Sequence, residues 1–564
     1  MPLVFKEDEQ TKRLDELHTK EAEDLAQVLA QKYNLSYVDL SKLPINTDAL
    51  HLIPEAEARA GKIAVFKISG KSLWVVILSP NNPATQRIIG ELRDKNFSVT
   101  AHLGSEASLN RALERYQEIS LSTAAKTGIV DIANDTINAF LREIKDAAGI
   151  RVRLDEEAKL ILKEGGVTNL LEVILAGAIL VKASDVHLEP EAESLRLRYR
   201  LDGVLNDFAI FDQKIHRPLL ARIKLVSGLK LNIKSAAQDG RFSLKLGQNE
   251  IEIRTAVLPG AYGESIVLRI LNPETLVIEF AALGVEPKLL ETLKRQIAKP
   301  NGLILLTGPT GSGKTTTLYA ILRILNTTET KIITIEDPIE YHLRGVSQTQ
   351  VNLGKNYTFI TGLRSALRQD PDILMVGEIR DPETAKIAID AALTGHLVLS
   401  TLHTNNAAGT IPRLIDLAVN PKIIEAALNI ALAQRLVRRL CPACRESYPP
   451  TAKEKNIIGA VFKGLKRKRP EPALEIPATL YRPKGCLACH QTGFRGRIGI
   501  FEAVVMTAAI AEQLSKNPSE WEIKKLADGE GLLDLREDGL LKVIGGVTAF
   551  SELERVVDLY AEVL

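Results

Sequence analysis

Long apolar stretches are missing from this sequence of 564 residues. The most apolar run, Val173 to Val181, is far shorter than the roughly 20 residues that a transmembrane helix needs. The amino-terminal segment MPLVFKEDEQ also lacks the basic start and apolar centre of a secretion signal. We therefore expect a cytoplasmic protein that reaches the inner face of a membrane only through partner proteins.

The sequence also has no large excess of charge of either sign, and it has few aromatic residues. Lys and Arg number 72 and Asp and Glu number 70, so the formal net charge is only +2, and aromatic residues make up 5%. Both values argue against nucleic acid as a partner, because such proteins combine basic surfaces with stacking platforms. The 45% hydrophobic and 25% charged residues are typical of a globular protein, and the length predicts about three to four domains.

Cysteine is scarce, and its four copies form two Cys-x-x-Cys pairs, Cys441/Cys444 and Cys486/Cys489. None is left over for a disulfide framework. Two such pairs can close a tetrahedral site of four thiolates, for which zinc is the first choice. Redox-active cysteines or free thiols are the alternatives. The basic run at 463–469, between the two pairs, is predicted to be a solvated loop, with a docking site for an acidic partner as the alternative.

The pattern along the chain predicts an α/β protein of several parts. One apolar helix, Leu170–Val181, precedes strand-like stretches such as SLRLRYRL, whose alternation puts Leu195, Leu197, Tyr199 and Leu201 on one face. After about residue 283, short apolar strands alternate with helices, which is typical of a mostly parallel sheet. We expect a disordered segment at 1–20, an α/β docking module at 21–116, a helical linker at 117–164, an α+β domain at 165–275, and a parallel α/β domain at 276–564 with an insertion at 440–497 and a helical cap from 498 onward.

The first pattern that carries chemistry is GPTGSGKTT at residues 308–316. It matches GxxxxGK[ST] between an apolar strand, LILLT, and a helical segment, TTLYAILRIL, and this is the context that a phosphate-binding loop requires. We expect Lys314 to reach the β- and γ-phosphates of ATP and Thr315 to hold Mg²⁺. The residues predicted to contact the nucleotide here are Gly308, Pro309, Thr310, Gly311, Ser312, Gly313, Lys314, Thr315 and Thr316.

Two further strands end in carboxylates. DILMVGE at 372–378 is typical of a Walker B strand, in which apolar residues bury the strand and an acid stands at its edge beside the phosphates. We expect Glu378 to orient or deprotonate an attacking water; a carboxylate that caps a helix is the alternative. TIEDPIE delivers Glu336, Asp337 and Glu340 at the end of a second strand, where a solvated acidic turn is the alternative.

Two histidines, His396 and His403, flank the strand LVLST. A single histidine is more often a structural residue than a catalytic one. Two of them around a strand beside a phosphate site are candidates for sensing the phosphate.

Taken together, these motifs resemble the secretion ATPase superfamily, whose members power type II secretion and type IV pilus assembly. GPTGSGKTTTLYA, TIEDPIEY, LRQDPDILMVGEIRD and TGHLVLSTLHTN are similar to its Walker A, Asp box, Walker B and His box, in that order. Upstream, SDVHLEP, LRYRLDG, QDGR, IEIR and GESIVLRI resemble its second amino-terminal domain, and CPAC, CLAC and GFRGRIGIFE resemble its zinc-bearing insertion. The pilus retraction motors are less similar, because they lack the insertion and the first module.

The resemblance implies a fold and a set of site residues. The fold is a RecA-like P-loop NTPase domain with a zinc-binding insertion, preceded by a small PAS-like α+β domain and an α/β module, with ATP bound between domains. The implied catalytic acid is Glu378. Further residues are implied as members of the Asp box, of the His box, and as arginines that reach the γ-phosphate: Glu336, Asp337, Glu340, His396, His403, Arg241 and Arg254. For the two arginines, salt bridges on a strand face are the alternative.

The resemblance also implies a function and partners. We expect a homo-hexameric motor that hydrolyses ATP to extend a type IV pilus, with the pseudopilus of type II secretion as the alternative. A nucleic-acid translocase and a nucleotide-gated scaffold without turnover are less favoured. The implied partners are an inner-membrane platform protein, its cytoplasmic adaptor and, indirectly, a pilin or pseudopilin; the implied cofactors are ATP, Mg²⁺ and Zn²⁺. The first module lacks the Arg-Leu-Gly repeat of relatives that bind cyclic di-GMP, so we assign no such ligand.

Overall fold

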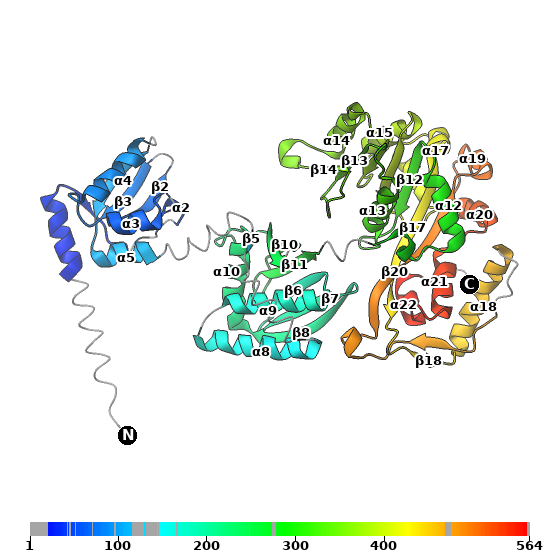
Figure 1. The fold of residues 1–564 in the computed structure, drawn as a ribbon, viewed down its shortest axis with the longest axis horizontal. Helices are drawn as coiled ribbons and strands as arrows, with labels where there is room; N and C mark the ends of the chain where they lie inside the picture. The colour runs from blue at the N-terminus through cyan, green and yellow to red at the C-terminus, as the bar shows by residue number, and fades with distance from the viewer. Residues whose placement is uncertain are drawn as a thin grey trace, which may run out of the picture. The chain divides into compact units, whose positions relative to one another are not determined.

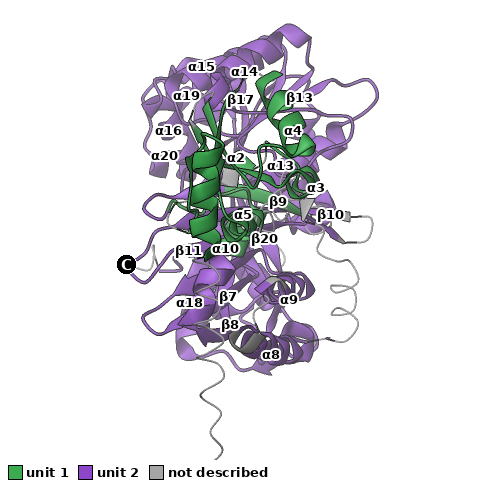
Figure 2. Cartoon of the chain, turned by 90° about the vertical axis from the view of Figure 1, so that its left-hand side faces the viewer, with its two compact units in different colours: residues 1–130, 221–233, 240–243 green, residues 131–220, 234–239, 244–564 purple. Residues whose placement is uncertain are grey.

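The computed structural model describes most of the chain, namely residues 21–41, 43, 45, 47–50, 52–69, 72–94, 97–114, 129–130, 144, 146–164, 167–246, 249–272, 278–468 and 475–560. The predicted disordered segment at 1–20, most of the predicted linker between 117 and 143, and Arg469 at the end of the basic run lie outside the described residues. The chain divides into two compact units, shown in Figure 2. The first contains residues 1–130, 221–233 and 240–243, and the second contains the rest.

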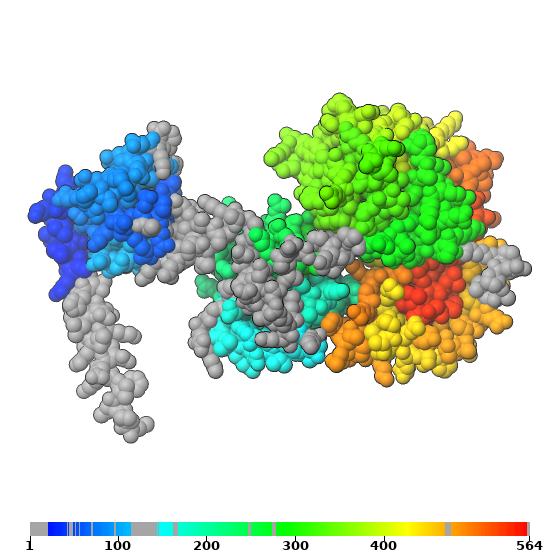
Figure 3. Space-filling model, in the orientation of Figure 1, coloured from blue at the N-terminus to red at the C-terminus, as the bar shows by residue number. Residues whose placement is uncertain are grey.

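The first unit contains a four-stranded sheet in the order β1-β4-β3-β2 (Figure 1). Its described residues between 21 and 114 form one rounded body, blue in Figure 3. The strands β2 and β3 are antiparallel and the other pairs are parallel, so the α/β character predicted for this segment is confirmed. Its strands and helices are β1 (Ser36–Tyr37), α2 (Thr47–Leu50), α3 (Glu55–Gly61), β2 (Ile63–Ser69), β3 (Ser72–Ile77), α4 (Pro83–Asp94), β4 (Ser98–Leu103) and α5 (Glu106–Glu114), with a short β5 (Ile129–Val130) further on.

Residues 21–32 are helical, as the spacing of Leu25, Val28 and Leu29 predicts, but of these three only Leu29 lies against the buried face. Ala26 and Ala30 are 4% and 1% exposed, whereas Leu25 and Val28 are 61% and 63% exposed. The helix therefore packs mainly through its small residues, with Leu29 beside them, and presents Leu25 and Val28 to solvent.

The second unit begins with an α+β arrangement whose antiparallel strands follow the order β10-β11-β6-β7-β8 (Figure 1). The predicted alternation in β7 is confirmed, because Leu195, Leu197 and Tyr199 are fully buried while the residues between them are half-buried. The elements are α8 (Ala147–Glu164), α9 (Val167–Leu180), β6 (Asp185–Pro190), β7 (Ser194–Leu201), β8 (Val204–Asp212), β10 (Asn249–Leu258) and β11 (Ser265–Leu271). The division between the units passes through α10 (His216–Val226) and β9 (Gln238–Leu246).

Helix α8 falls within the predicted linker at 117–164, yet it packs like part of a domain. Its Ile150 and Leu154 are fully buried. The guanidinium of Arg151 lies over the ring of Phe208 in β8, 5.4 Å from its centroid, and Arg151 also donates to the carbonyl of Asp207. Apolar burial of this kind ties α8 to the neighbouring sheet.

The carboxyl-terminal part of the second unit is built on a seven-stranded sheet in the order β14-β13-β15-β16-β12-β17-β20. The first six strands are parallel, as their short apolar pattern predicts, and β20 runs antiparallel to β17. All residues of β12 are buried, and its alternate side chains enter separate cores on the two faces of the sheet. The strands are β12 (Gly302–Thr307), β13 (Ile332–Glu336), β14 (Ser347–Gln350), β15 (Ile373–Val376), β16 (Leu397–Leu402), β17 (Leu428–Leu440) and β20 (Phe494–Val505).

Helices cover both faces of this sheet. One core includes side chains of α12 (Pro287–Ile297) and α13 (Lys314–Leu325). The other includes side chains of α14 (Phe359–Ala366), α15 (Pro382–Leu393), α16 (Thr410–Asp416), α17 (Pro421–Ala427), α18 (Ala452–Lys468), α19 (Ala508–Leu514), α20 (Glu520–Ala527), α21 (Leu535–Ile544) and α22 (Phe550–Val556). Among the described residues, no helix combines the length and apolar character needed to cross a membrane.

The insertion lies between β17 and β20, which pair from Ile430 and Val505 to Leu440 and Phe494. It contains β18 (Glu446–Tyr448), α18 and β19 (Leu480–Arg482). The prediction of a helical cap from residue 498 is wrong for 498–505, which form the larger part of β20. The apolar run in IGIFEAVV fills a buried edge of the central sheet, and the helices begin only at α19.

Candidate active site

Four of the predicted motifs meet at one edge of the central sheet. The strands β13, β15, β16 and β12 are neighbours and run parallel, so their carboxyl ends lie along the same edge. The phosphate loop follows β12, His403 follows β16, Glu378 follows β15, and the segment Asp337–Glu340 follows β13. Strand order alone thus assembles residues that are nearly 100 positions apart in the sequence.

The loop between β12 and α13 needs glycine for steric reasons. Gly308, Gly311 and Gly313 have φ angles of +144°, +77° and +90°, a region that other residues rarely adopt. A Cβ atom on Gly308 would lie 2.5 Å from the backbone oxygen of Gln434, and one on Gly313 would lie 2.7 Å from the Nε2 of the same residue. The loop is therefore pressed against β17 and closes tightly ahead of α13.

The polar groups of this loop fit a phosphate ligand. Lys314 is the first residue of α13, and its Nζ donates to the carbonyls of Gly308 at 2.7 Å and Pro309 at 3.1 Å. The Oγ of Ser312 is buried and has no hydrogen-bond partner among the described residues. An anion at the helix amino terminus would satisfy such donors. Thr315 is exposed and Thr316 half-exposed, and Pro309 and Thr310 face solvent.

Burial lowers the pKa of the Lys314 ammonium, the charge of Glu378 acts to raise it, and that of Arg435 lowers it further. The ammonium is therefore a partly desolvated cation that a phosphate would stabilise.

Glu378 lies between an arginine and a histidine. Its Oε1 is 2.5 Å from Nη2 of Arg380, and its Oε2 is 3.5 Å from Nε2 of His403. Glu378 is 13% exposed, whereas Arg380 and His403 are 70% and 49% exposed. The carboxylate is thus fixed at the edge of the site, within electrostatic range of Lys314.

The three acids after β13 occupy different environments. Glu336 is 2% exposed, and its carboxylate accepts from the hydroxyls of Tyr319 and Thr334 and from Nε2 of Gln348. Burial and the adjacent Glu336 raise the pKa of Tyr319. Asp337 is exposed and Glu340 is half-exposed. Glu336 therefore holds a buried polar network, while Asp337 and Glu340 remain open to solvent.

Arg254 of β10 reaches the same segment. Its Nη2 donates to the carbonyl of Ile339 at 2.9 Å, and its Nη1 lies 3.9 Å from Oε2 of Glu340. The α+β part of this unit therefore touches the chain that follows β13. Arg241 is exposed on β9, in the stretch that belongs to the first unit.

His396 lies at the opposite edge of the sheet from His403. Its carbonyl accepts from Gly302 at the start of β12, and its Nδ1 is 3.0 Å from the carbonyl of Ala391. The six residues of β16 separate the two histidines, which is roughly 20 Å at the usual rise of a strand. Within one chain, the structure therefore does not bring His396 to the phosphate loop.

Arg435 is a residue of this site that the sequence motifs did not identify. Its Nη1 lies 2.9 Å from the position of a Cβ on Gly308, and its Nη2 donates to the carbonyl of Asn405 at 2.6 Å. On the other side, the hydroxyl of Thr307 bonds to Thr404 beside His403. Arg435 lies in the stretch LAQRLVRRL, which contains no recognisable motif. Only the pairing of β17 with β12 places Arg435 beside the phosphate loop.

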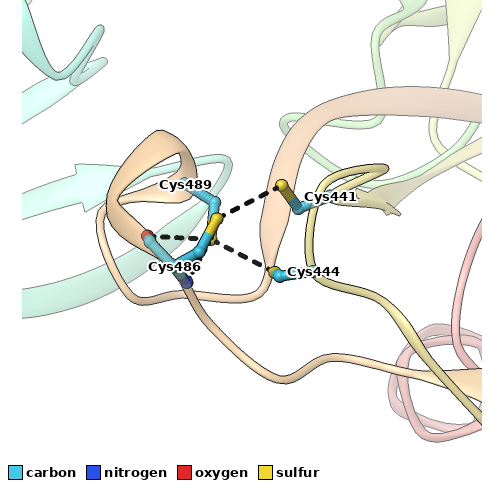
Figure 4. A group of neighbouring side chains, drawn as sticks. All are labelled: Cys441, Cys444, Cys486 and Cys489. Atoms are coloured by element: carbon cyan, nitrogen blue, oxygen red, sulfur yellow. Dashed lines mark hydrogen bonds between the residues drawn. The ribbon is translucent and has the colours of Figure 1, made fainter.

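The four cysteines converge from the two ends of the insertion, as Figure 4 shows. Their sulfur atoms all lie within 4.8 Å of one another, and no disulfide joins them. The Sγ atoms of Cys441 and Cys486 are 3.9 Å apart, and those of Cys444 and Cys489 are 3.8 Å apart. Four thiolates around one ion at about 2.3 Å would be about 3.8 Å from each other, so the donor set fits a tetrahedral metal.

Two family models match the chain. Residues 162–555 match the model described as "Type II/IV secretion system protein", and residues 33–123 match the one described as "MshEN domain". The first covers the α+β arrangement, the phosphate loop and the insertion together.

Individual relatives agree with this match. The type II secretion system protein E of Dickeya dadantii is 38% identical over 92% of this chain and 99% of its own. The type IV pilus assembly ATPase PilB of Myxococcus xanthus is 36% identical over 94% of this chain and 91% of its own. Among solved structures, the pilus retraction motor PilT with bound ADP covers 68% of this chain and 94% of its own, at 26% identity and a TM-score of 0.45.

Proposed function

The chain belongs to the type II/IV secretion ATPase family, and from this premise we propose that it hydrolyses ATP to power the extension of a type IV pilus at an inner-membrane platform. Family membership carries the enzyme class, ATP hydrolysis by a RecA-like domain. The observation that carries the proposal for this chain is the meeting of the phosphate loop, Glu378 and His403 at one sheet edge.

In this proposal the loop residues 308–316 bind the phosphates of ATP through backbone N–H groups. Lys314 neutralises the β- and γ-phosphates, and Thr315 holds Mg²⁺. Glu378 takes the proton of the attacking water or orients it, and His403, beside it, responds to the γ-phosphate. Glu336 keeps the Asp-box strand in place, with Asp337 and Glu340 facing the nucleotide. We keep His396 only as a residue that another subunit of an oligomer could use.

We propose that two arginines couple ATP hydrolysis to the movement of domains. Arg254 already touches the segment after β13, and a guanidinium is suited to stabilise charge on a transferring phosphoryl group. We propose that Arg254 and Arg241 reach the γ-phosphate when the domains of a homo-hexamer close. We retain the domain division drawn from the sequence, but we start the second domain at about Ala147, because α8 packs against it.

For the four cysteines we propose structural zinc. The sulfur separations support this assignment, and a site of four thiolates leaves no open position for catalysis. Bound zinc would hold the two ends of the insertion together, where β17 and β20 separate.

A second candidate function is the pseudopilus motor of type II secretion. The relative from Dickeya dadantii is named as a type II secretion system protein E, and its identity to this chain, 38%, is similar to the 36% of the pilus relative. For both functions we propose the same partners, which are a platform protein, its cytoplasmic adaptor and, indirectly, a pilin or pseudopilin. The membrane is reached only through them, so the protein works at the inner face of the cytoplasmic membrane, without nucleic acid.

Two experiments test the proposal. Purified Lys314→Ala protein should lose ATP hydrolysis to background, because the cation facing the phosphates is gone; turnover near the wild-type rate would refute the phosphate site. Deletion of the gene in its own host should abolish surface pili while extracellular enzymes are still secreted; complementation with the wild-type gene should restore the pili, and complementation with Lys314→Ala should not. Loss of secretion with intact pili would select the second candidate.

A further inference from the structure

The loop after β16 is held from four directions. Thr404 bonds to Thr307, the last residue before the phosphate loop, and the carbonyl of Asn405 accepts from Arg435. The side chain of Asn406 donates to Oε1 of Glu520 at the start of α20. The backbone N–H of Ala407 donates to Oε1 of Glu502 at 2.9 Å. These four consecutive residues follow His403 directly, so their hydrogen bonds fix the position of the backbone that carries the imidazole of His403.

Glu502 has the most unusual position among these partners. It lies on β20, opposite Ala433 of β17, and β17 separates β20 from β12, the strand that leads into the phosphate loop. Its Oε1 faces the loop at Ala407, and its Oε2 faces the backbone N–H of Leu535, the first residue of α21, at 3.5 Å. One carboxylate therefore joins the His403 loop to the helices that follow the insertion.

Burying the carboxylate of Glu502 costs desolvation free energy, which indicates that the carboxylate has a specific role. Glu502 is 9% exposed as a whole residue, and burial together with Asp534 raises the pKa of its carboxyl. An apolar side chain, like those of Ile500 and Val504 on the same face of β20, could be buried there without that cost. The backbone N–H of Ala407 is buried, so only a side chain with a hydrogen-bond acceptor at position 502 can satisfy it.

We propose that Glu502 is a positioning residue for ATP hydrolysis. It fixes the loop from Thr404 to Ala407, and with it His403, against Glu378, and it links this geometry to the start of α21. The carboxylate acts through its hydrogen bonds to the backbone of Ala407 and Leu535. The inference depends on the proposed site around Lys314 and Glu378, which the turnover of the wild-type protein and its loss in Lys314→Ala test separately.

The experiment compares Glu502→Ala with a matched control in the full-length chain. Asp538 is also a buried carboxylate, 2% exposed; it accepts from the N–H of Phe501, next to Glu502, and pairs with Lys542 at 2.5 Å. These contacts join Asp538 to β20 and α21, and neither involves the His403 loop. Asp538→Asn therefore disturbs the same part of β20 without releasing that loop. Steady-state ATPase rates, KM for ATP and melting temperature are measured for each variant.

Glu502→Ala should lower kcat about tenfold or more, because small misplacements of catalytic groups cost up to about 10² in rate. KM for ATP should stay within about threefold, since Lys314 and its loop are untouched. Asp538→Asn should lower the melting temperature but keep kcat within about twofold at a temperature where it is folded. Normal kcat in Glu502→Ala, or an equal loss of kcat in Asp538→Asn, would overturn the proposal.

A second comparison applies even if Glu502→Ala does not fold. Glu502→Gln keeps one oxygen that can accept from the N–H of Ala407, so it should fold and retain part of the wild-type activity. If Glu502 acts through the His403 loop, Glu502→Gln should lower kcat much less in a His403→Ala background than in the wild type. Effects that simply multiply in the double variant would show that Glu502 acts elsewhere.

Discussion

Replacing Glu378 with Gln is the most direct test of the chemistry proposed for this site. The substitution keeps the shape of the side chain and removes the negative charge between Arg380 at 2.5 Å and His403 at 3.5 Å. Lys314 is held by the carbonyls of Gly308 and Pro309, so the phosphate loop does not depend on this carboxylate. ATP binding should therefore change little, while the step that needs a base should slow.

The expected magnitude follows from general-base catalysis. Loss of a positioned base costs about 10² to 10⁴ in rate, and the lower value corresponds to about 2.7 kcal/mol in the activation barrier. We expect Glu378→Gln to lose at least the smaller factor in kcat. The matched control is Glu383→Gln on the neighbouring helix α15, where the carboxylate is 54% exposed and paired with Arg364. A surface pair of this kind is worth only about 0–1 kcal/mol, so turnover should not change.

The assay combines steady-state phosphate release with equilibrium binding of a fluorescent ATP analogue. A Glu378→Gln protein that hydrolyses ATP at nearly the wild-type rate would refute the assignment of Glu378 as the base. A protein that loses binding and turnover in parallel would show instead that the carboxylate supports the loop.

Three other outcomes are expected. Wild-type protein purified without chelator should contain about one zinc per chain, and replacing Cys441 and Cys444 with Ser should remove the metal and lower the melting temperature; metal-free wild type would exclude the site. Arg254→Ala and Arg241→Ala should each cut turnover heavily, with ATP affinity within a few-fold and little change in melting temperature; normal turnover in both would leave only surface salt bridges. Burial acts to raise the pKa of the Glu552 carboxyl, but hydrogen bonds from two arginines lower it overall. Its stabilisation is therefore complete above about pH 4.3 and is lost as pH falls below that value. Glu552→Gln should cost about 3–5 kcal/mol at pH 7, and urea titrations at pH 7 and pH 3 should show the difference shrinking in acid; an equal difference at both pH values would contradict this.

Much of the fold could be predicted because the responsible patterns are local. The alternation of SLRLRYRL predicted the buried face of β7, and the apolar runs before Thr307 and Val376 predicted β12 and β15. Where the pattern is ambiguous, prediction was less successful. IGIFEAVV was assigned to a helical cap, but it lies on an edge strand of the sheet, because a short apolar run fits a buried helix and a buried strand equally well.

The candidate site shows the same division at the level of single residues. Gly308 and Lys314 could be identified because their roles depend on neighbours within a few positions, as in any phosphate loop. His396 was grouped with His403 because the two flank one strand, yet a strand carries its ends to opposite edges of a sheet. Arg435 has no motif of its own, and it reaches the loop only because β17 pairs with β12.

Groups that are close along the chain follow from the amino-acid pattern alone: the phosphate loop, the acid after its buried strand, and the two cysteine pairs. Backbone connectivity holds such groups together before any tertiary contact forms. Which strands are neighbours, and hence that Glu378 and His403 meet while His396 lies far away, depends on how the chain packs in three dimensions. The same packing also decides that Glu502 and Arg435 hold the loop after β16, because burial and strand pairing bring together residues whose separation in sequence carries no signal.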